Sequence, residues 1–359
     1  MKKLIFLLLL TSLNICTFAQ EGVIFHDLNF DAALAKAKAE NKLLFIDCYT
    51  SWCGPCKYMV STIFPMEKVG SYMNPKFVCV KYDMEKSEGP ELAKKFGIQG
   101  FPTFLILNPD GNVRHRLIGG DEADKFISRV DEAFDDTKAT GVLETEYQKG
   151  NRDKSFMMKY IRSLYSVYAP NAPSVAYELF QSLNEKERVS DTYWFLFEKS
   201  ELAPENSELA NYVLQKRKKF NKTIGKEKTD RCIYNCYQQK ILGVFMGDTT
   251  ITSQDLERMD KKISILKLPK GEVLQGTIRI AGAKLKKDTE QLLSACEQEI
   301  AHIPAEDFPY FSLGYDLQPK LSPAQLKRWI EISKQLAAKS ENPQFKKQLN
   351  QTVSQLEKK

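Results

Sequence analysis

Apolar and polar positions along the first third of the chain alternate between two kinds of stretch. Short apolar runs bounded by polar or turn-forming residues predict strands at 43–49, 77–83, 103–107 and 113–118. Stretches with helical spacing, capping residues or Gly and Pro at their ends predict helices at 29–40, 57–64, 66–73, 89–97 and 121–134. This order, βαβαββα behind an N-terminal helix, predicts an α/β fold with parallel strands joined by crossovers and a final antiparallel pair.

The rest of the chain shows no strand-like alternation. It predicts helices at 156–168, 174–183, 191–199, 207–220, 228–242, 253–266, 271–286, 288–302 and 322–339, with prolines between them or at their starts. Around 135–149 the sequence turns polar, which predicts a domain boundary. We therefore expect an α/β domain at 20–140 and an all-α domain at 141–359, since a chain of this length exceeds a single core.

The first 19 residues have the layout of a secretory signal peptide. A basic start is followed by the unbroken apolar run 4–10 and by small residues ending at Ala19. The run is too short to span a membrane as a helix. Export with cleavage after Ala19 is predicted. Lipid anchoring through Cys16 is the less favoured alternative, because Ile15 is large for such a site.

The composition and net charge of the chain exclude several classes of function. Charged residues make up 27% of the chain and apolar residues 43%, which is typical of a globular protein. The net charge of +6 falls to +4 without Lys2 and Lys3 (50 minus 46), too small an excess for a dedicated nucleic-acid binder. No later segment is apolar enough to cross a membrane, and no nucleotide fingerprint or His ligand spacing is present. We expect no nucleic acid, no metal and no cofactor.

One motif carries the chemistry: Cys53-Gly54-Pro55-Cys56, between a predicted strand and a predicted helix. A helix N-terminus favours the thiolate, so Cys53 is the predicted nucleophile, with Cys56 one turn deeper as the resolving thiol. Gly54 permits the tight turn and Pro55 opens a helix without needing an amide. A structural disulfide and half of a zinc site are alternatives. A zinc site would need a second ligand pair of C-x-x-C or H-x-x-H type, and the chain has none.

The segment Trp52–Lys57 resembles the active-site loop of thioredoxins. The resemblance continues at Asp47, where that family has a buried acid, at Lys81, where it has a lysine that pairs with the acid, and at Phe101-Pro102-Thr103, its cis-proline loop. It covers about residues 22–136. The longer pattern is most similar to exported bacterial thioredoxin-like domains, including the periplasmic domain of membrane thiol:disulfide interchange proteins.

The resemblance implies a role for each matching residue. The implied catalytic residues are Cys53, Cys56, Asp47 and Lys81, and the implied substrate-binding residues are Trp52, Gly54, Pro55, Phe101 and Pro102. Asp47 would move a proton to or from Cys56 through water. Plainer alternatives are a strand-end carboxylate in solvent for Asp47, an ordinary turn proline for Pro102 and surface packing for Trp52.

These residues predict an exported, periplasmic thiol:disulfide oxidoreductase acting on protein or peptide substrates. Gly-Pro between the cysteines resembles the reducing members of the family, which favours disulfide reduction and implies a membrane electron donor. A disulfide oxidase or isomerase is one alternative. Another is a non-catalytic adaptor whose helical domain recruits a client protein.

The other cysteines receive simpler interpretations. Cys48 and Cys79 lie in apolar strands and are predicted to be small core residues. Cys232 and Cys236 are four residues apart on one predicted helix, which is poor geometry for a mutual disulfide. Either of them could pair with Cys296, and the sequence leaves this open.

Overall fold

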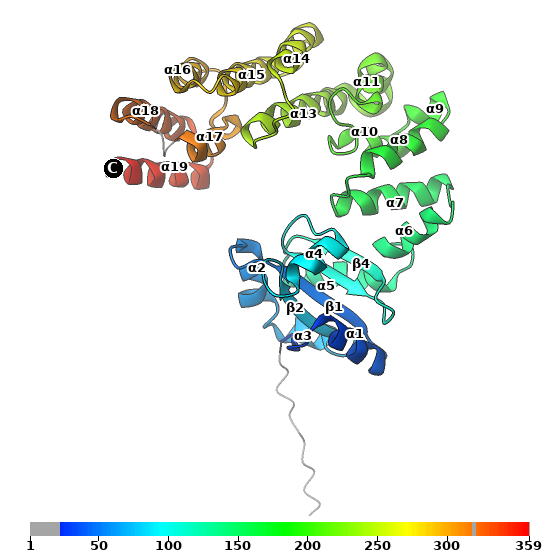
Figure 1. The fold of residues 1–359 in the computed structure, drawn as a ribbon. Helices are drawn as coiled ribbons and strands as arrows, with labels where there is room; N and C mark the ends of the chain where they lie inside the picture. The colour runs from blue at the N-terminus through cyan, green and yellow to red at the C-terminus, as the bar shows by residue number, and fades with distance from the viewer. Residues whose placement is uncertain (1–21, 318–320, 359) are drawn as a thin grey trace, which may run out of the picture. The chain divides into compact units, whose positions relative to one another are not determined.

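The computed structural model describes residues 22–317 and 321–358 (Figure 1). Their contacts divide the chain into two compact units, with the division between Pro170 and Asn171. The signal peptide predicted for residues 1–19 lies outside the described residues.

The first unit is built on a four-stranded sheet with the order β2-β1-β3-β4. The strands are β1 (Leu43–Tyr49), β2 (Phe77–Asp83), β3 (Thr103–Leu107) and β4 (Val113–Ile118). β1 pairs in parallel with β2 and antiparallel with β3, and β3 pairs antiparallel with β4. All four strands have the predicted bounds, and the predicted α/β class is confirmed.

Helices cover both faces of this sheet (Figure 1). On one face lie α1 (Phe30–Ala39) and α4 (Gly89–Phe96). On the other lie α2 (Gly54–Tyr58), its π-helical continuation η1 (Met59–Ile63), α3 (Glu67–Met73) and α5 (Ala123–Asp131), followed by η2 (Glu132–Phe134). Apart from α2, each of these helices contributes apolar side chains to the core cluster on its own face, so both faces of the sheet are covered.

Side-chain alternation along β1 decides which residues lie beneath α2. Leu44, Ile46 and Cys48 belong to the core on the α1 and α4 face. Phe45 points to the opposite face, where it packs against Phe64, Phe77, Phe104 and Phe126. Asp47 follows Phe45 by two residues, so the pleat places it on the same face as α2.

The polar stretch predicted as a boundary forms a helix of the first unit. α6 (Thr140–Gln148) and α7 (Lys154–Ser166) pack together, and α6 also packs on β4. The Gly141 backbone is so close to β4 that an added Cβ would lie 1.9 Å from the carbonyl oxygen of Val113. The start of α6 therefore covers the edge strand of the sheet, which is otherwise open to pairing with another chain.

The second unit is helical throughout its described residues, which confirms the predicted all-α class. It contains α8 (Ala172–Ser182), α9 (Glu185–Arg188), η3 (Asp191–Tyr193), α10 (Phe195–Glu198), α11 (Glu208–Gln215), α12 (Arg217–Phe220), η4 (Asn221–Gly225), α13 (Lys226–Phe245), α14 (Ser253–Leu266), α15 (Gly271–Leu285), α16 (Thr289–Glu299), η5 (Ala305–Asp307), α17 (Tyr310–Leu317), α18 (Pro323–Lys339) and α19 (Pro343–Leu356). The predicted extents of the helices at 191–199 and 207–220 are wrong, because each of these segments forms two shorter helices. α19 lies beyond the last predicted helix and is not among the predicted helices.

Candidate active site

The turn between β1 and α2 places the cysteine pair at the start of a helix. β1 ends at Tyr49 and α2 begins at Gly54, so Cys53 is the N-cap residue. Its backbone is extended, with φ −69° and ψ 110°, and its amide donates to the carbonyl of Thr50 at 3.2 Å. Pro55 occupies the first turn of α2, where no amide partner is needed.

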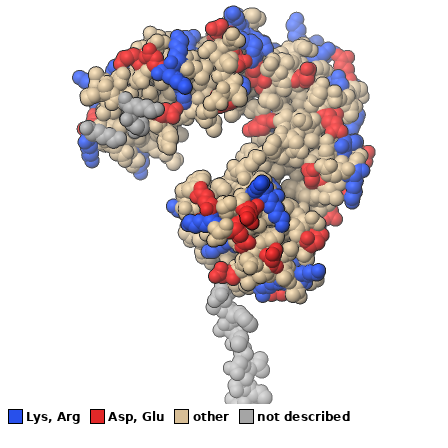
Figure 2. All heavy atoms as spheres, in the orientation of Figure 1, with Lys and Arg blue, Asp and Glu red and all other residues tan. Residues whose placement is uncertain are grey.

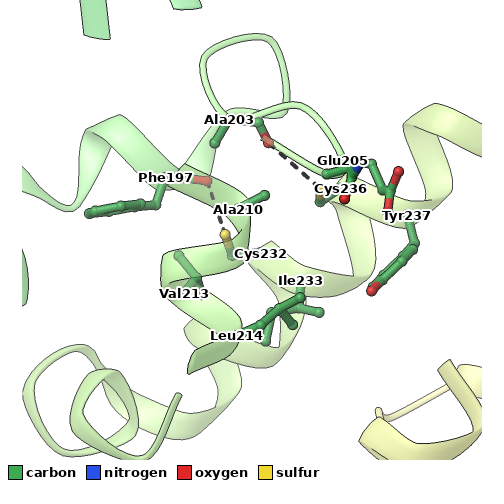
Figure 3. Close-up of a pocket in the computed structure, with 11 residues that line it drawn as sticks. Phe197, Ala203, Glu205, Ala210, Val213, Leu214, Cys232, Ile233, Cys236 and Tyr237 are labelled. Atoms are coloured by element: carbon green, nitrogen blue, oxygen red, sulfur yellow. Dashed lines mark hydrogen bonds between the residues drawn. The ribbon is translucent and has the colours of Figure 1, made fainter. Parts of the chain in front are cut away.

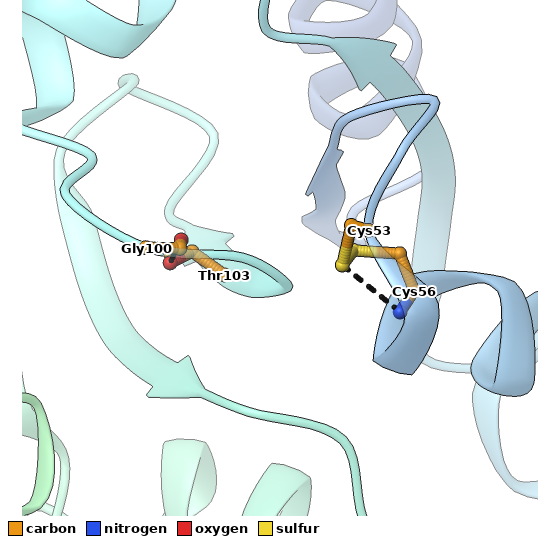
Figure 4. The surroundings of a disulfide bond; sticks show 4 residues. All are labelled: Cys53, Cys56, Gly100 and Thr103. Atoms are coloured by element: carbon orange, nitrogen blue, oxygen red, sulfur yellow. Dashed lines mark hydrogen bonds between the residues drawn. A yellow bond between two sulfur atoms is a disulfide. The ribbon is translucent and has the colours of Figure 1, made fainter. Parts of the chain in front are cut away.

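Cys53 and Cys56 form a disulfide, with their Cα atoms 5.3 Å apart (Figure 4). The backbone amide of Cys56 donates a hydrogen bond to Cys53 Sγ at 3.1 Å. This hydrogen bond and the partial positive charge of the helix start both stabilise negative charge on that sulfur. The arrangement therefore favours a thiolate at Cys53 rather than at Cys56.

Exposure does not distinguish the two cysteines. Each is 3% exposed, so Cys56 is no more buried than Cys53 in this oxidised form. The residues around them are open to solvent: Trp52 is 65% exposed, and Gly54 and Pro55 are also exposed. The hydrogen bond to Cys53 Sγ and the place of Cys53 at the helix start, rather than exposure, therefore make the two sulfurs chemically different.

Asp47 carries a carboxyl group that is enclosed by the first unit. The residue is 1% exposed, and neither carboxyl oxygen has a hydrogen-bond partner. Burial raises the pKa of Asp47 to about 7, and the charge of Lys81 lowers it only in part. The alternative of a carboxylate in solvent is therefore wrong. A carboxyl group that titrates near neutral pH is suited to accepting and returning a proton.

Lys81 stands beside Asp47 in the parallel register of β2 and β1. Its side chain is nevertheless exposed, and Nζ lies 5.6 Å from the centre of the Phe25 ring. The Asp47 carboxyl group accepts no hydrogen bond from it. The family resemblance implies that Asp47 and Lys81 form a pair. In this structure the two side chains are not hydrogen-bonded and interact only through the electrostatic effect of Lys81 on Asp47.

The loop before β3 faces the disulfide (Figure 4). The Phe101–Pro102 peptide bond in this loop is cis. Thr103 Oγ1 donates to the carbonyl of Gly100 at 2.7 Å, and the amide of Gly119 donates to the carbonyl of Pro102 at 2.8 Å. The loop predicted to pair with a substrate is thus stabilised by a hydrogen bond between its own two ends, Thr103 and Gly100, and by a hydrogen bond from Gly119 in the turn after β4.

Aromatic side chains connect the loops around the disulfide. The rings of Trp52 and Phe101 meet edge to face, with centroids 5.9 Å apart. Trp52 Nε1 donates to Glu85 at 2.9 Å, and the Tyr58 hydroxyl donates to Glu122 at 2.8 Å. The sequence analysis missed both glutamates, because each partner is distant along the chain and no motif marks it.

His115 is a buried titratable group in the same unit. Its Nδ1 accepts a hydrogen bond from the amide of Thr140 at 3.1 Å, and Nε2 lies 3.2 Å from the carbonyl of Arg129. These partners require a neutral ring that carries its proton on Nε2. Burial lowers the pKa of His115 to about 4. The imidazole therefore joins β4 to α5 and α6 and stays uncharged at neutral pH.

The cysteines of the second unit are free thiols. Cys232, Cys236 and Cys296 form no disulfide, so the pairing with Cys296 left open above is absent. Cys232 donates to the carbonyl of Phe197 and Cys236 to that of Ala203, at the wall of a small apolar pocket (Figure 3). Burial raises the pKa of both thiols to about 12. Cys232 is buried and Cys236 half-buried, and neutral thiols in such apolar surroundings are inert at neutral pH.

The described residues show no metal-binding cluster and no membrane-spanning helix. Residues 22–317 and 321–358 contain no group of three or more His, Cys, Asp and Glu side chains placed to hold a metal ion. None of the helices in these ranges has the length and hydrophobicity needed to cross a membrane. On the visible face, Lys and Arg side chains are interspersed with Asp and Glu (Figure 2).

The sheet, the N-capping cysteine and the facing cis-proline loop together define a thioredoxin-like oxidoreductase domain. Comparison with known proteins agrees: residues 22–132 match the family model described as Thioredoxin. Over 109 residues the chain is 33% identical to thioredoxin H-type from Oryza sativa subsp. indica. The matched segment covers 30% of this chain and 84% of that relative. The chain belongs to the thioredoxin family through this segment.

Other relatives share the same segment. Thioredoxin Y, chloroplastic, from Oryza sativa subsp. japonica is 33% identical over 110 residues, and the match spans 31% of this chain and 60% of that relative. Thiol:disulfide interchange protein DsbD from Pseudomonas fluorescens is 29% identical over 100 residues, 27% of this chain and 17% of that protein. Among solved structures, a candidate disulphide-isomerase from Bacteroides thetaiotaomicron is 43% identical, with a TM-score of 0.30, over 32% of this chain and 95% of that chain.

Proposed function

We propose that the protein is an exported thiol:disulfide oxidoreductase that reduces disulfides of protein or peptide substrates. The observation that carries the proposal is the sulfur of Cys53, which caps a helix, accepts the amide hydrogen of Cys56 and faces the cis-proline loop. Membership of the thioredoxin family supports the same chemistry.

The reaction begins with both cysteines reduced. The Cys53 thiolate attacks one sulfur of the substrate disulfide, whose S–S bond breaks, and the departing substrate sulfur takes up a proton. The Cys56 thiol then loses its proton and attacks Cys53 Sγ, which releases the second substrate thiol. The substrate gains two electrons and two protons, and Cys53 and Cys56 end as the disulfide seen in the structure.

Asp47 is the proposed acceptor of the Cys56 proton. Its pKa of about 7 suits a base at neutral pH, and its carboxyl oxygens are not occupied by other hydrogen bonds. The β1 pleat places it on the face of the sheet that α2 covers. Proton transfer between the two groups would pass through water.

Reduction is the proposed direction because Gly54 and Pro55 between the cysteines resemble the reducing members of the family. The predicted signal peptide supports action in the periplasm, where a membrane protein would return electrons to the oxidised cysteines. The resemblance to the periplasmic domain of membrane thiol:disulfide interchange proteins implies this setting, and the likeness to thiol:disulfide interchange protein DsbD supports thiol:disulfide exchange as the chemistry.

A trapping experiment tests the proposal. Cys56→Ser leaves the nucleophile but removes the resolving thiol, so we expect mixed disulfides between Cys53 and substrates to accumulate. Cys53→Ser should trap none, and it is the matched control because it also leaves one thiol at the site. Absence of trapped species with Cys56→Ser, together with failure of the native protein to reduce insulin, would contradict the proposed activity.

The direction of electron flow needs a second measurement. Alkylation of free thiols in intact cells after acid quenching reports the redox state of Cys53 and Cys56. A reductase should hold them mostly as thiols. Recovery of the pair almost wholly as the disulfide, with no membrane donor able to reduce it, would favour the oxidase or isomerase alternative.

A further inference from the structure

The turn between β4 and α5 connects the two loops of the active site. Its amide at Gly119 donates to the carbonyl of Pro102 at 2.8 Å. At Gly120 an added Cβ would lie 3.2 Å from Met59 Sδ and 3.6 Å from the carbonyl oxygen of Pro55, so the turn also packs on the active-site helix. A shift of this turn would move the cis-proline loop relative to the cysteines.

Two consecutive glycines make this turn intrinsically free to move. Gly119 has φ +85°, in a region that glycine adopts far more readily than other residues do, and no atom lies within 4 Å of the position that a Cβ would occupy there. Neither glycine has a side chain that could fix the conformation. The turn must therefore be held by contacts on either side of it.

Arg129, in the last turn of α5, supplies those contacts on both sides. Its Nη2 donates to the carbonyl of Ile118 at 3.0 Å, and its Nη1 forms a hydrogen-bonded ion pair with the carboxylate of Asp121. Ile118 comes directly before the two glycines and Asp121 directly after them. The planar guanidinium fork thus holds both ends of the turn at once.

The pair is shielded from water. The Arg129 side chain is 24% exposed and that of Asp121 9%, and Asp121 also accepts a bond from Lys125 at 2.5 Å. Charged hydrogen bonds that are partly shielded restrain their partners more strongly than exposed ion pairs do. These two interactions of Arg129 therefore add a strong restraint to a turn that otherwise has only the contact of Gly120 with the active-site helix and the Gly119–Pro102 hydrogen bond.

We propose that Arg129 is a positioning residue for substrate binding: it fixes the Gly119–Gly120 turn, and through the Gly119–Pro102 hydrogen bond it holds the cis-proline loop in place beside Cys53. This rests on the proposed function, because the loop is the surface on which a substrate chain would pair. Arg129 itself does not touch the cysteines or the substrate.

The test compares a protein disulfide with a small aromatic disulfide. Arg129→Met should raise KM for insulin about tenfold, the effect of losing one charged hydrogen bond, with kcat nearly unchanged. The rate of reaction with dithiobis-nitrobenzoate should stay within about twofold, because that reagent needs the thiolate but no extended pairing with the loop. Arg129→Lys keeps the charge and one donor and should recover part of the loss.

Arg114 offers a matched control. It lies on β4, its side chain is 22% exposed, and it joins a carboxylate, that of Asp136, to a backbone carbonyl, that of Ala133. Neither partner belongs to the turn or to the cis-proline loop. Arg114→Met should therefore leave KM for insulin unchanged, and it should lower the melting temperature less than Arg129→Met does, because the Asp136 side chain is 72% exposed.

Each outcome decides the inference. An unchanged KM in Arg129→Met, or an equal rise in Arg114→Met, would overturn it and leave Arg129 as an ordinary stabilising residue. If the native protein reduced neither insulin nor the small disulfide, the proposed function itself would fail. A native protein that is active with both, beside an unaffected Arg129→Met, would refute only the role of Arg129.

Discussion

Asp47→Asn tests whether a buried carboxyl group destabilises the first unit at neutral pH. Asp47 is 1% exposed and has no hydrogen-bond partner, and burial raises its pKa from 3.8 to about 7. Asparagine has nearly the same size and polarity but does not titrate. The substitution should therefore change how stability depends on pH while leaving the fold intact.

Proton binding determines the sign and size of the effect. Between pH 3.8 and about 7 the folded chain holds a proton at Asp47 that the unfolded chain has released, so the free energy of unfolding falls as pH rises through this range. Below pH 3.8 Asp47 is protonated in both the folded and the unfolded chain, and above about pH 7 it is protonated in neither. A difference of about three pKa units corresponds to about 4 kcal/mol. Asp47→Asn should be more stable than the native protein by up to that amount at high pH.

The assay must report on the first unit separately from the second. The buried free thiol of Cys48 lies on β1, next to Asp47, and becomes reactive only when the sheet opens. Urea titrations of the oxidised protein, followed by a short pulse of a thiol reagent that is active in acid and by mass spectrometry, give the free energy of unfolding of this unit. Measurements at about pH 4.5 and about pH 8.5 bracket the transition.

The refuting result is a stability difference between Asp47→Asn and the native protein that is the same at both pH values. Asp27→Asn is the control, since it makes the same chemical change at an exposed position of the same unit. Any contribution of His115 is common to all three proteins and cancels in the differences.

Three further predictions follow from the same unit. Burial lowers the pKa of His115 from 6.5 to about 4, so between these pH values only the unfolded chain gains a proton at this residue. The free energy of unfolding should therefore fall by about 3 kcal/mol as the pH drops from 6.5 to about 4. His115→Gln should remove this dependence on pH in acid titrations. Trp52→Ala removes the edge-to-face contact with Phe101 and should lower kcat/KM for insulin up to about tenfold without lowering the melting temperature. Gly141→Ala places a Cβ 1.9 Å from the carbonyl oxygen of Val113, and calorimetry should show a loss of about 1–3 kcal/mol.

Each of these three predictions would be contradicted by a specific result. A pH profile that is identical with and without the imidazole would show that His115 is not the acid-sensitive group. Trp52→Ala with native kcat/KM would remove the aromatic pair from substrate binding. Gly54→Ala, where no atom lies within 4 Å of the new Cβ, is the stability control for Gly141→Ala, and equal losses in the two would contradict the packing of α6 on β4.

Local sequence signals determined much of the first unit. Apolar runs bounded by turn residues predict the correct bounds of all four strands, because β1 to β3 are mostly buried, β4 alternates between buried and half-buried residues over much of its length, and turn-forming residues lie at strand ends. The Cys53–Cys56 motif identified the reactive pair, since the strand end, Gly54 and Pro55 each fix the local backbone. The polar composition of 135–149 predicts a boundary, yet α6 forms there by packing on β4.

The contacts that surround the dithiol could not be deduced from the sequence. Glu85 and Trp52 are 33 residues apart, and no periodicity links them. The separation of Lys81 from the Asp47 carboxyl group depends on side-chain directions that register alone does not fix.

The chain by itself therefore specifies the strands, the reactive cysteines and the helical character of the second unit, because hydrophobic periodicity and turn chemistry act over a few residues. Only the tertiary structure shows that Asp47 is buried without a partner and that Arg129 clamps the turn behind the cis-proline loop. Burial and long-range hydrogen bonds arise when distant segments pack together, and that packing sets the proton affinities and the rigidity on which the proposed chemistry depends.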